Sequence, residues 1–224
     1  MLKKHYKIKV DHIITNWLKK KRWFLFQHQI DLLEKSKLGY DIVLNSPTGT
    51  GKTLAGFLPS IENLIQKNSK SLHTLYISPL KSLAYDIERN LRKPINEMNL
   101  DISFETRTGD TKFSIKKKQL NSPPNILFTT IESFVLLMAE KKDVFEHLKF
   151  IIVDEVHSIV NTKRGELLSL NLTRLKTKIK KIQTIILSAT LKDPKEAGNY
   201  FCSKNYKILK PKINKQISLK ILNS

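Results

Sequence analysis

Residues 46–53 read SPTGTGKT, a run of small residues that ends in a lysine and a threonine. Consecutive backbone N–H groups in such a turn can surround a phosphate tail, and Gly49 and Gly51 allow the backbone to approach it closely. Lys52 would reach the β- and γ-phosphates, and the Thr53 hydroxyl would ligate Mg²⁺. The strict pattern starts with glycine, where this chain has Ser46. The run predicts a nucleotide-phosphate site lined by Ser46, Pro47, Thr48, Gly49, Thr50, Gly51, Lys52 and Thr53.

Two adjacent acids, Asp154 and Glu155, follow the apolar run Phe150–Val153. Phosphoryl transfer to water needs a further support for Mg²⁺ and a group that positions or deprotonates the water. Asp154 suits the metal role, and Glu155 suits the water role. Acids also end strands simply because strands end at solvent. The phosphate cradle earlier in the chain favours the catalytic interpretation.

A histidine and a later run of small hydroxyl residues extend this candidate catalytic set. His157 has no cysteine or second histidine at metal-ligand spacing, so it predicts no metal cluster, and a plain surface histidine is the alternative. The run TIILSAT ends in residues suited to hydrogen bonding with a neighbouring strand end. We expect His157 to form a polar relay from the nucleotide site with Ser188, Ala189 and Thr190.

Short apolar runs that alternate with amphipathic stretches must position these residues. Apolar runs without polar alternation are typical of a parallel sheet that is covered on both faces, so the pattern predicts a doubly wound α/β domain. In such a sheet, ligands bind at the carboxyl ends of the strands, where every motif above falls. The expected strands are Ile42–Asn45, Thr74–Ser78, Ile102–Thr106, Ile126–Thr129, Phe150–Val153 and Thr184–Ser188. The expected helices include Lys52–Gln66, Ser82–Met98, Glu132–Glu140 and Gly165–Lys178.

The composition is that of a globular chain with a strong positive charge. The 224 residues carry a formal net charge of +20, which indicates a polyanionic partner because lysine and arginine release counterions from phosphate backbones. Coding bias toward lysine is the alternative explanation. No apolar run is long enough for a membrane span, so we expect no membrane partner. The lone cysteine, Cys202, excludes an internal disulfide and fits a cytoplasmic location.

Together, these motifs resemble those of superfamily 2 helicases. SPTGTGKT is similar to their motif I, DEVH (Asp154–His157) to motif II, and SAT (Ser188–Thr190) to motif III. The RWFLFQHQ stretch resembles their adenine-recognition element, with Gln29 as the matching glutamine. ISPLKSLAYDIERNL resembles motif Ia, and ILFTTIES resembles the TTPES motif, although Ile131 replaces its proline.

The resemblance covers roughly residues 12–203 and can be narrowed to one group. The stretches HTLYISPLKSLAYDIERNL, ETRTGDT and TKRGELLSLNLTRL look like the large-helicase-related (Lhr) proteins, and most like the ligase-associated DEXH-box DNA helicases of bacteria. The resemblance implies a single RecA-like domain over residues 1–205, with ATP and Mg²⁺ as cofactors. It also implies ATP-driven translocation on DNA, in the 3′-to-5′ direction, in DNA repair. Residues 206–224 resemble the link to a second RecA-like domain.

By the same resemblance, a nucleic-acid track would cross the ends of the strands. Loops at strand ends can present N–H groups and hydroxyls to phosphates without reading bases. Ordinary turn capping is the alternative for any single serine or threonine. Lys163 and Arg164 are either further contacts or a solvated helix start, and we favour the second. The implied contacts are Pro79, Lys81, Ser82, Arg107, Thr108, Gly109, Thr130, Glu132 and Ser133.

The resemblance also implies a partner for the ATP site. Helicases of this type close ATP between two RecA-like domains, and the second domain brings an arginine finger. No candidate finger occurs here, so we expect another chain, or a missing part of the gene, to supply that domain. Three hypotheses remain: such a split DNA helicase, a nucleotide- and nucleic-acid-binding module with little activity alone, or an RNA helicase. A small-molecule kinase is disfavoured, because motifs Ia and III would have no use there.

Overall fold

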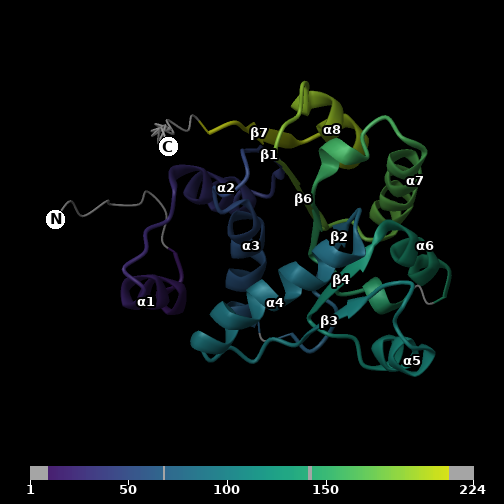
Figure 1. The fold of residues 1–224 in the computed structure, drawn as a ribbon, viewed down its shortest axis with the longest axis horizontal. Coiled ribbons are helices and arrows are strands. Elements are labelled where there is room, and N and C mark those ends of the chain that lie inside the picture. The colour runs from purple at the N-terminus through teal and green to yellow at the C-terminus, as the bar shows by residue number, and fades with distance from the viewer. Residues whose placement is uncertain (1–9, 68, 141–142, 212–224) are drawn as a thin grey trace, which may run out of the picture.

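In the computed structural model, a seven-stranded sheet runs through the centre of the protein in the order β3-β4-β2-β5-β6-β1-β7 (Figure 1). The structure describes residues 10–67, 69–140 and 143–211. All neighbouring strands are parallel, so their carboxyl ends meet at one edge. The strands are β1 (Asp41–Asn45), β2 (Thr74–Ser78), β3 (Phe104–Arg107), β4 (Ile126–Thr130), β5 (Phe150–Val153), β6 (Gln183–Ser188) and β7 (Tyr206–Leu209).

Helices cover both faces of the sheet and enclose two hydrophobic cores. In β1, Ile42 and Leu44 face one core while Val43 faces the other, as the period of two along a strand requires. The first core packs under α1 (His12–Lys20), α2 (Gln27–Lys37), α3 (Lys52–Lys67) and α4 (Lys81–Glu97). The second packs under α6 (Ile131–Glu140), α7 (Lys163–Lys178) and α8 (Pro194–Phe201). The short helix α5 (Phe113–Asn121) lies beside the β3 edge (Figure 1).

This architecture confirms the α/β, RecA-like fold class expected from the sequence. The predicted strands are present: β2 and β5 have the expected bounds, β1, β4 and β6 differ from the expectation by one residue at one end, and the third predicted strand is displaced to Phe104–Arg107. Of the described helices, none is long and apolar enough to cross a bilayer.

The sheet extends past residue 205, where the sequence places the domain boundary, and that boundary stays a prediction. Residues Tyr206–Leu209 form β7, which pairs in parallel with β1 and so belongs to the sheet. Its sequence, YKIL, is short and mixes polar with apolar residues, so it lacks the continuous apolar pattern of a central strand. The rest of the predicted basic tail, residues 212–224, lies outside the described part of the chain.

Candidate nucleotide site and nucleic-acid surface

The phosphate cradle connects β1 to α3, which begins at Lys52. Gly49 and Gly51 both have positive φ angles, +73° and +75°, a conformation that glycine adopts without strain. The Ser46 hydroxyl is fully buried and lies 2.8 Å from the Thr50 hydroxyl. Thr50 in turn donates to the Pro47 carbonyl at 2.8 Å. These bonds hold the turn and explain how serine replaces the usual first glycine.

Gln29 braces this loop from α2. Its amide oxygen accepts a hydrogen bond from the Phe26 backbone N–H at 2.9 Å, and its amide nitrogen donates to the Gly51 carbonyl at 3.1 Å. A Cβ atom at Gly51 would lie 2.6 Å from that nitrogen, so the contact requires glycine. The exposed ring of Phe26 stacks on His28 nearby, with ring centroids 5.7 Å apart. Recognition of adenine by Gln29 stays a prediction.

Asp154 is buried at the end of β5 and is held by a tyrosine from the neighbouring strand. The Tyr76 hydroxyl donates to its carboxylate at 2.8 Å, and the Glu155 backbone N–H donates to the other oxygen at 2.8 Å. Burial raises the pKa of Asp154, while these hydrogen bonds and the charge of Lys52 oppose that rise. The Tyr76 ring packs against Phe57 and Phe128.

Tyr76 was missed by sequence reasoning, which placed it only as a strand residue. Burial, and then the charge of Asp154, raise the pKa of its hydroxyl well above the usual value, so it stays a protonated donor. The one available signal was a tyrosine inside an otherwise apolar strand, because a buried hydroxyl needs a partner.

Glu155, His157 and Ser188 lie together beside Asp154. Glu155 has a left-handed backbone, with φ +49°, which turns the chain sharply after β5. The His157 Nδ1 atom lies 3.2 Å from the Ser188 hydroxyl and 3.2 Å from a Glu155 carboxylate oxygen. The Ser188 carbonyl also accepts from the Ser46 backbone N–H at 2.9 Å, so the strand ends β1, β5 and β6 are connected. Ala189 is half-buried and Thr190 is exposed beyond them.

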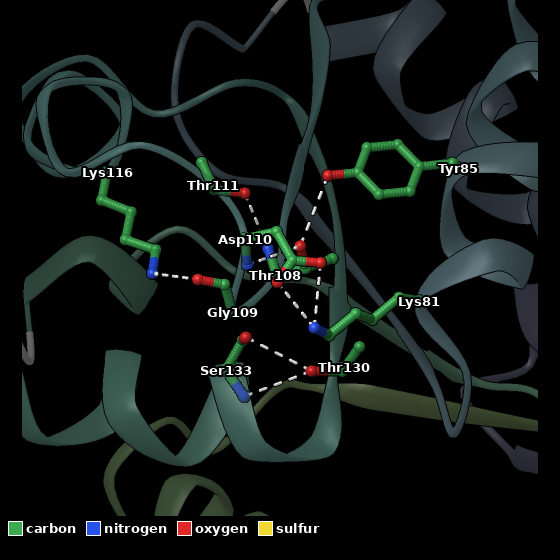
Figure 2. Close-up of polar contacts among 9 residues, drawn as sticks. All are labelled: Lys81, Tyr85, Thr108, Gly109, Asp110, Thr111, Lys116, Thr130 and Ser133. Carbon is green, nitrogen blue, oxygen red and sulfur yellow. Dashed lines mark hydrogen bonds and ion pairs between the residues drawn. The ribbon is translucent and has the colours of Figure 1, made fainter.

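The loop 108–111 lies at the centre of the expected nucleic-acid contacts (Figure 2). The Lys81 ammonium group contacts both carboxylate oxygens of the exposed Asp110, at 2.7 and 2.9 Å. Thr108 lies 3.3 Å from the Tyr85 hydroxyl, and the Gly109 carbonyl accepts from Lys116 at 3.2 Å. These contacts fix the loop.

The remaining expected contacts adjoin this loop. The Thr130 hydroxyl bonds to the hydroxyl and backbone N–H of Ser133 across the first turn of α6 (Figure 2). Pro79 lies two residues before the start of α4, and Ser82 is exposed in that helix's first turn.

Arg164 connects two of these segments, although the sequence favoured a solvated helix start for it. Its guanidinium donates to the Pro79 carbonyl at 2.8 Å and to the Glu132 carboxylate at 2.8 Å. Burial opposes ionisation of Glu132, but bonds from its own backbone N–H and from Arg164 outweigh that effect and lower its pKa. Arg164 therefore positions the loop after β2 against the start of α6.

The expected phosphate contact by the Arg107 side chain is corrected by the structure. Arg107 is only 1% exposed, and its guanidinium points inward, where it pairs with Glu140 and donates to the Lys116 carbonyl at 3.0 Å. A buried arginine that already has carboxylate and carbonyl partners is not available to a phosphate on the surface. Its role is to join β3 to α5 and α6.

Comparison with known proteins agrees with this geometry. The DEAD/DEAH box helicase family model matches residues 26–197. The ATP-dependent helicase Lhr-Core of Saccharolobus solfataricus is 33% identical in an alignment of 227 positions that covers 94% of this chain and 26% of that protein. The Lhr helicase/probable uracil glycosylase of Mycolicibacterium smegmatis is 36% identical in an alignment of 187 positions that covers 77% of this chain and 12% of that protein. The chain thus spans about a quarter or less of these relatives.

Solved structures give the same result. The structure of Mycobacterium smegmatis helicase Lhr bound to ssDNA and AMP-PNP superimposes with a TM-score of 0.84 at 33% identity, covering 91% of this chain and 28% of that one. The DUF1998 helicase MrfA bound to DNA and AMPPNP gives a TM-score of 0.79 at 27% identity, covering 90% of this chain and 29% of that one. The resemblance to Lhr proteins is confirmed, whereas the ligase-associated subgroup stays a prediction. This chain belongs to the DEAD/DEAH box helicase family.

Proposed function

We propose that this chain is the first RecA-like domain of an ATP-dependent DNA helicase. The observation that carries the proposal is the run of polar contacts between three strand ends: the Ser46 backbone N–H donates to the Ser188 carbonyl, and His157 Nδ1 lies 3.2 Å from both the Ser188 hydroxyl and a Glu155 carboxylate oxygen. Such a connection allows the state of the nucleotide site to reach neighbouring elements. A bare phosphate-binding loop would not need it.

In this proposal, the residues of the cradle hold the phosphates of ATP. Lys52 neutralises the β- and γ-phosphates, and backbone N–H groups of residues 46–53 surround them. One hydroxyl, from Thr53, and one carboxylate, from Asp154, fit Mg²⁺, which keeps several waters and takes its other ligands from phosphates. When bound there, Mg²⁺ would supply positive charge that stabilises the negative charge developing on the transferred phosphate.

Glu155 positions the water that attacks the γ-phosphate. It follows Asp154 directly, its left-handed backbone turns the chain at that point, and His157 Nδ1 lies 3.2 Å from its carboxylate. His157 and the Ser188–Thr190 segment couple this step to movement of the domain. A second RecA-like domain closes the site from the other side and supplies the arginine finger.

DNA lies across the edge of the sheet where the carboxyl ends of the strands meet. The enzyme acts in DNA repair and is located in the cytoplasm. Lys81 and Ser82, the loop with Thr108 and Gly109, and the start of α6 with Thr130, Glu132 and Ser133 supply its contacts. The relatives that carry DNA, Lhr at 33% and MrfA at 27% identity, favour DNA over RNA.

The test is phosphate release from Mg²⁺-ATP with and without single-stranded DNA. DNA should stimulate hydrolysis, and Glu155→Gln should abolish it while leaving nucleotide binding intact. Hydrolysis that appears only after a separate chain with an arginine finger is added supports a split enzyme. Stimulation of hydrolysis by RNA but not by single-stranded DNA would contradict the DNA assignment. If no condition gives hydrolysis, the helicase proposal fails and the hypothesis of a nucleotide- and nucleic-acid-binding module remains.

A further inference from the structure

Helix α5 exposes Phe113 and Ile115 and buries a polar residue, while its third apolar residue, Leu120, is half-buried against the second core. Phe113, at 82%, is the most exposed large hydrophobic residue in the described part of the chain, and Ile115 is also exposed. The buried residue of the helix is Gln119. A surface helix normally turns its apolar stripe toward the core. Phe113 therefore contributes nothing to the core and is available to a partner.

Polar contacts hold the helix in place beneath this aromatic ring. The buried Arg107 donates to the Lys116 carbonyl at 3.0 Å. The Gln119 amide donates to Glu105 at 2.9 Å and to the Thr106 carbonyl at 3.3 Å. These contacts fix the second and third turns to β3, so Phe113 projects from an anchored element.

The surroundings of Phe113 are positively charged. The segment 104–121 contains five basic residues and two acidic ones. Both acids already have partners: Glu105 contacts Lys118 and Gln119, and Asp110 contacts Lys81. The exposed lysines of this segment are Lys112, Lys117 and Lys118.

The helix is continuous with the proposed DNA contacts. Lys116, in its second turn, donates to the Gly109 carbonyl, and Figure 2 shows Lys116 and Lys81 on opposite sides of the loop that carries Gly109. A strand whose phosphates contact Lys81 therefore has a basic surface to follow onto α5.

We propose that Phe113 is a stacking site for an unpaired base of single-stranded DNA, with the lysines of α5 contacting the adjacent phosphates. This inference rests on the proposed function, and it adds a contact to a base where that function needs only contacts to the backbone. An aromatic ring beside lysines suits the π-face of a base and its phosphate. The site accepts any base, because every base has such a face, and it excludes paired bases, whose faces are already stacked.

The experiment compares the full chain with Phe113→Ala and Phe113→Trp. Binding is measured to a fluorescent oligothymidine and to an abasic oligonucleotide of the same length and charge. We expect Phe113→Ala to bind oligothymidine about tenfold more weakly, since one base stack contributes about 1–3 kcal/mol. Its affinity for the abasic strand should match that of wild type, and Phe113→Trp should bind oligothymidine at least as tightly as wild type.

Leu38→Ala is the matched control. Leu38 is 63% exposed and precedes β1, so it lies near the amino ends of the strands, away from α5. Its replacement should change the affinity neither for oligothymidine nor for the abasic strand. The inference is overturned if Phe113→Ala binds oligothymidine like wild type, or if it loses the same factor on the abasic strand. Wild type that binds no oligonucleotide overturns the proposed function, and this inference with it.

Discussion

At the scale of single residues, Tyr76 holds the buried carboxylate of Asp154 at the candidate nucleotide site. Its hydroxyl is the side-chain donor that fixes one oxygen of the buried Asp154 and lowers the pKa of that acid. Tyr76→Phe keeps the ring contacts with Phe57 and Phe128 but removes this bond. The pKa of Asp154 should then rise further, because burial is less opposed. We expect Mg²⁺-dependent binding of a fluorescent ATP analogue to weaken by about tenfold, the order of one hydrogen bond to a charge.

The pH dependence tests the cause of that loss. In Tyr76→Phe, binding should fall at a higher pH than in wild type, as Asp154 takes up a proton earlier. Tyr40→Phe is the control, since Tyr40 precedes β1, away from the carboxyl edge. Equal pH profiles for Tyr76→Phe and wild type would contradict the role given to the hydroxyl.

The protonation of one buried residue, His73, should affect the stability of the whole fold. Burial, and then the charges of Lys67 and Lys149, lower its pKa to about 4. As the pH falls, His73 therefore takes up a proton near pH 6.5 in the unfolded chain but only near pH 4 in the folded protein. Unfolding free energy should decrease by up to about 3 kcal/mol as the pH falls through this window.

Urea denaturation at several pH values measures this effect. His73→Gln should be less stable at pH 7, because its bonds to Asn63 and Thr74 are altered, and should lose most of the slope between pH 4 and 6.5. An unchanged slope in this variant would assign the acid sensitivity to other groups.

At the scale of elements, the sequence predicts best where local pattern and chemistry agree. The cradle before Lys52 and the acids after Val153 were found because each ends an apolar run at a strand terminus. Arg107 was misassigned because nothing local shows that its side chain turns inward to Glu140. The β7 strand was missed because its place depends on pairing with β1, a contact made far along the chain.

The attachment of β7 can be tested through Gly198 in α8. A Cβ atom there would lie 2.4 Å from the Tyr206 ring, so Gly198→Ala forces α8 and β7 apart. We expect a loss of about 1–3 kcal/mol in unfolding free energy, the usual cost of overpacking. In Gly109→Ala the nearest atom is the Lys81 ammonium nitrogen at 3.6 Å, and stability should hardly change. Similar urea midpoints for both variants would argue against a packed β7.

At the scale of the whole molecule, the net charge of +20 opposes compactness and favours a polyanion. Much of the positive charge lies on lysines, which act as point charges and read no sequence. Single-stranded DNA should therefore bind with little sequence preference and weaken steeply with salt. A flat response to salt would contradict an electrostatic surface.

The pair of Lys81 and Asp110 shows how this charge is used at the carboxyl edge. Both carboxylate oxygens of Asp110 accept from the Lys81 ammonium group, so a DNA phosphate that binds Lys81 must displace the Asp110 carboxylate. Asp110→Asn should then bind single-stranded DNA a few times more tightly, since an exposed pair contributes up to about 1 kcal/mol. Lys81→Ala should bind more weakly and lower the slope of log affinity against log salt by about 0.7, the value for one phosphate contact.

Fluorescence anisotropy across a salt series measures both effects, with Lys204→Ala as the control. Lys204 is exposed just before β7, so it lies toward the opposite edge and should leave the slope unchanged. If all lysine variants lower the slope equally, DNA is held by the net charge alone. If only Lys81→Ala lowers the slope, the DNA follows the carboxyl edge of the sheet. The proposed nucleotide and DNA sites then lie at the ends of the same β-strands, so ATP turnover is able to act on the bound DNA.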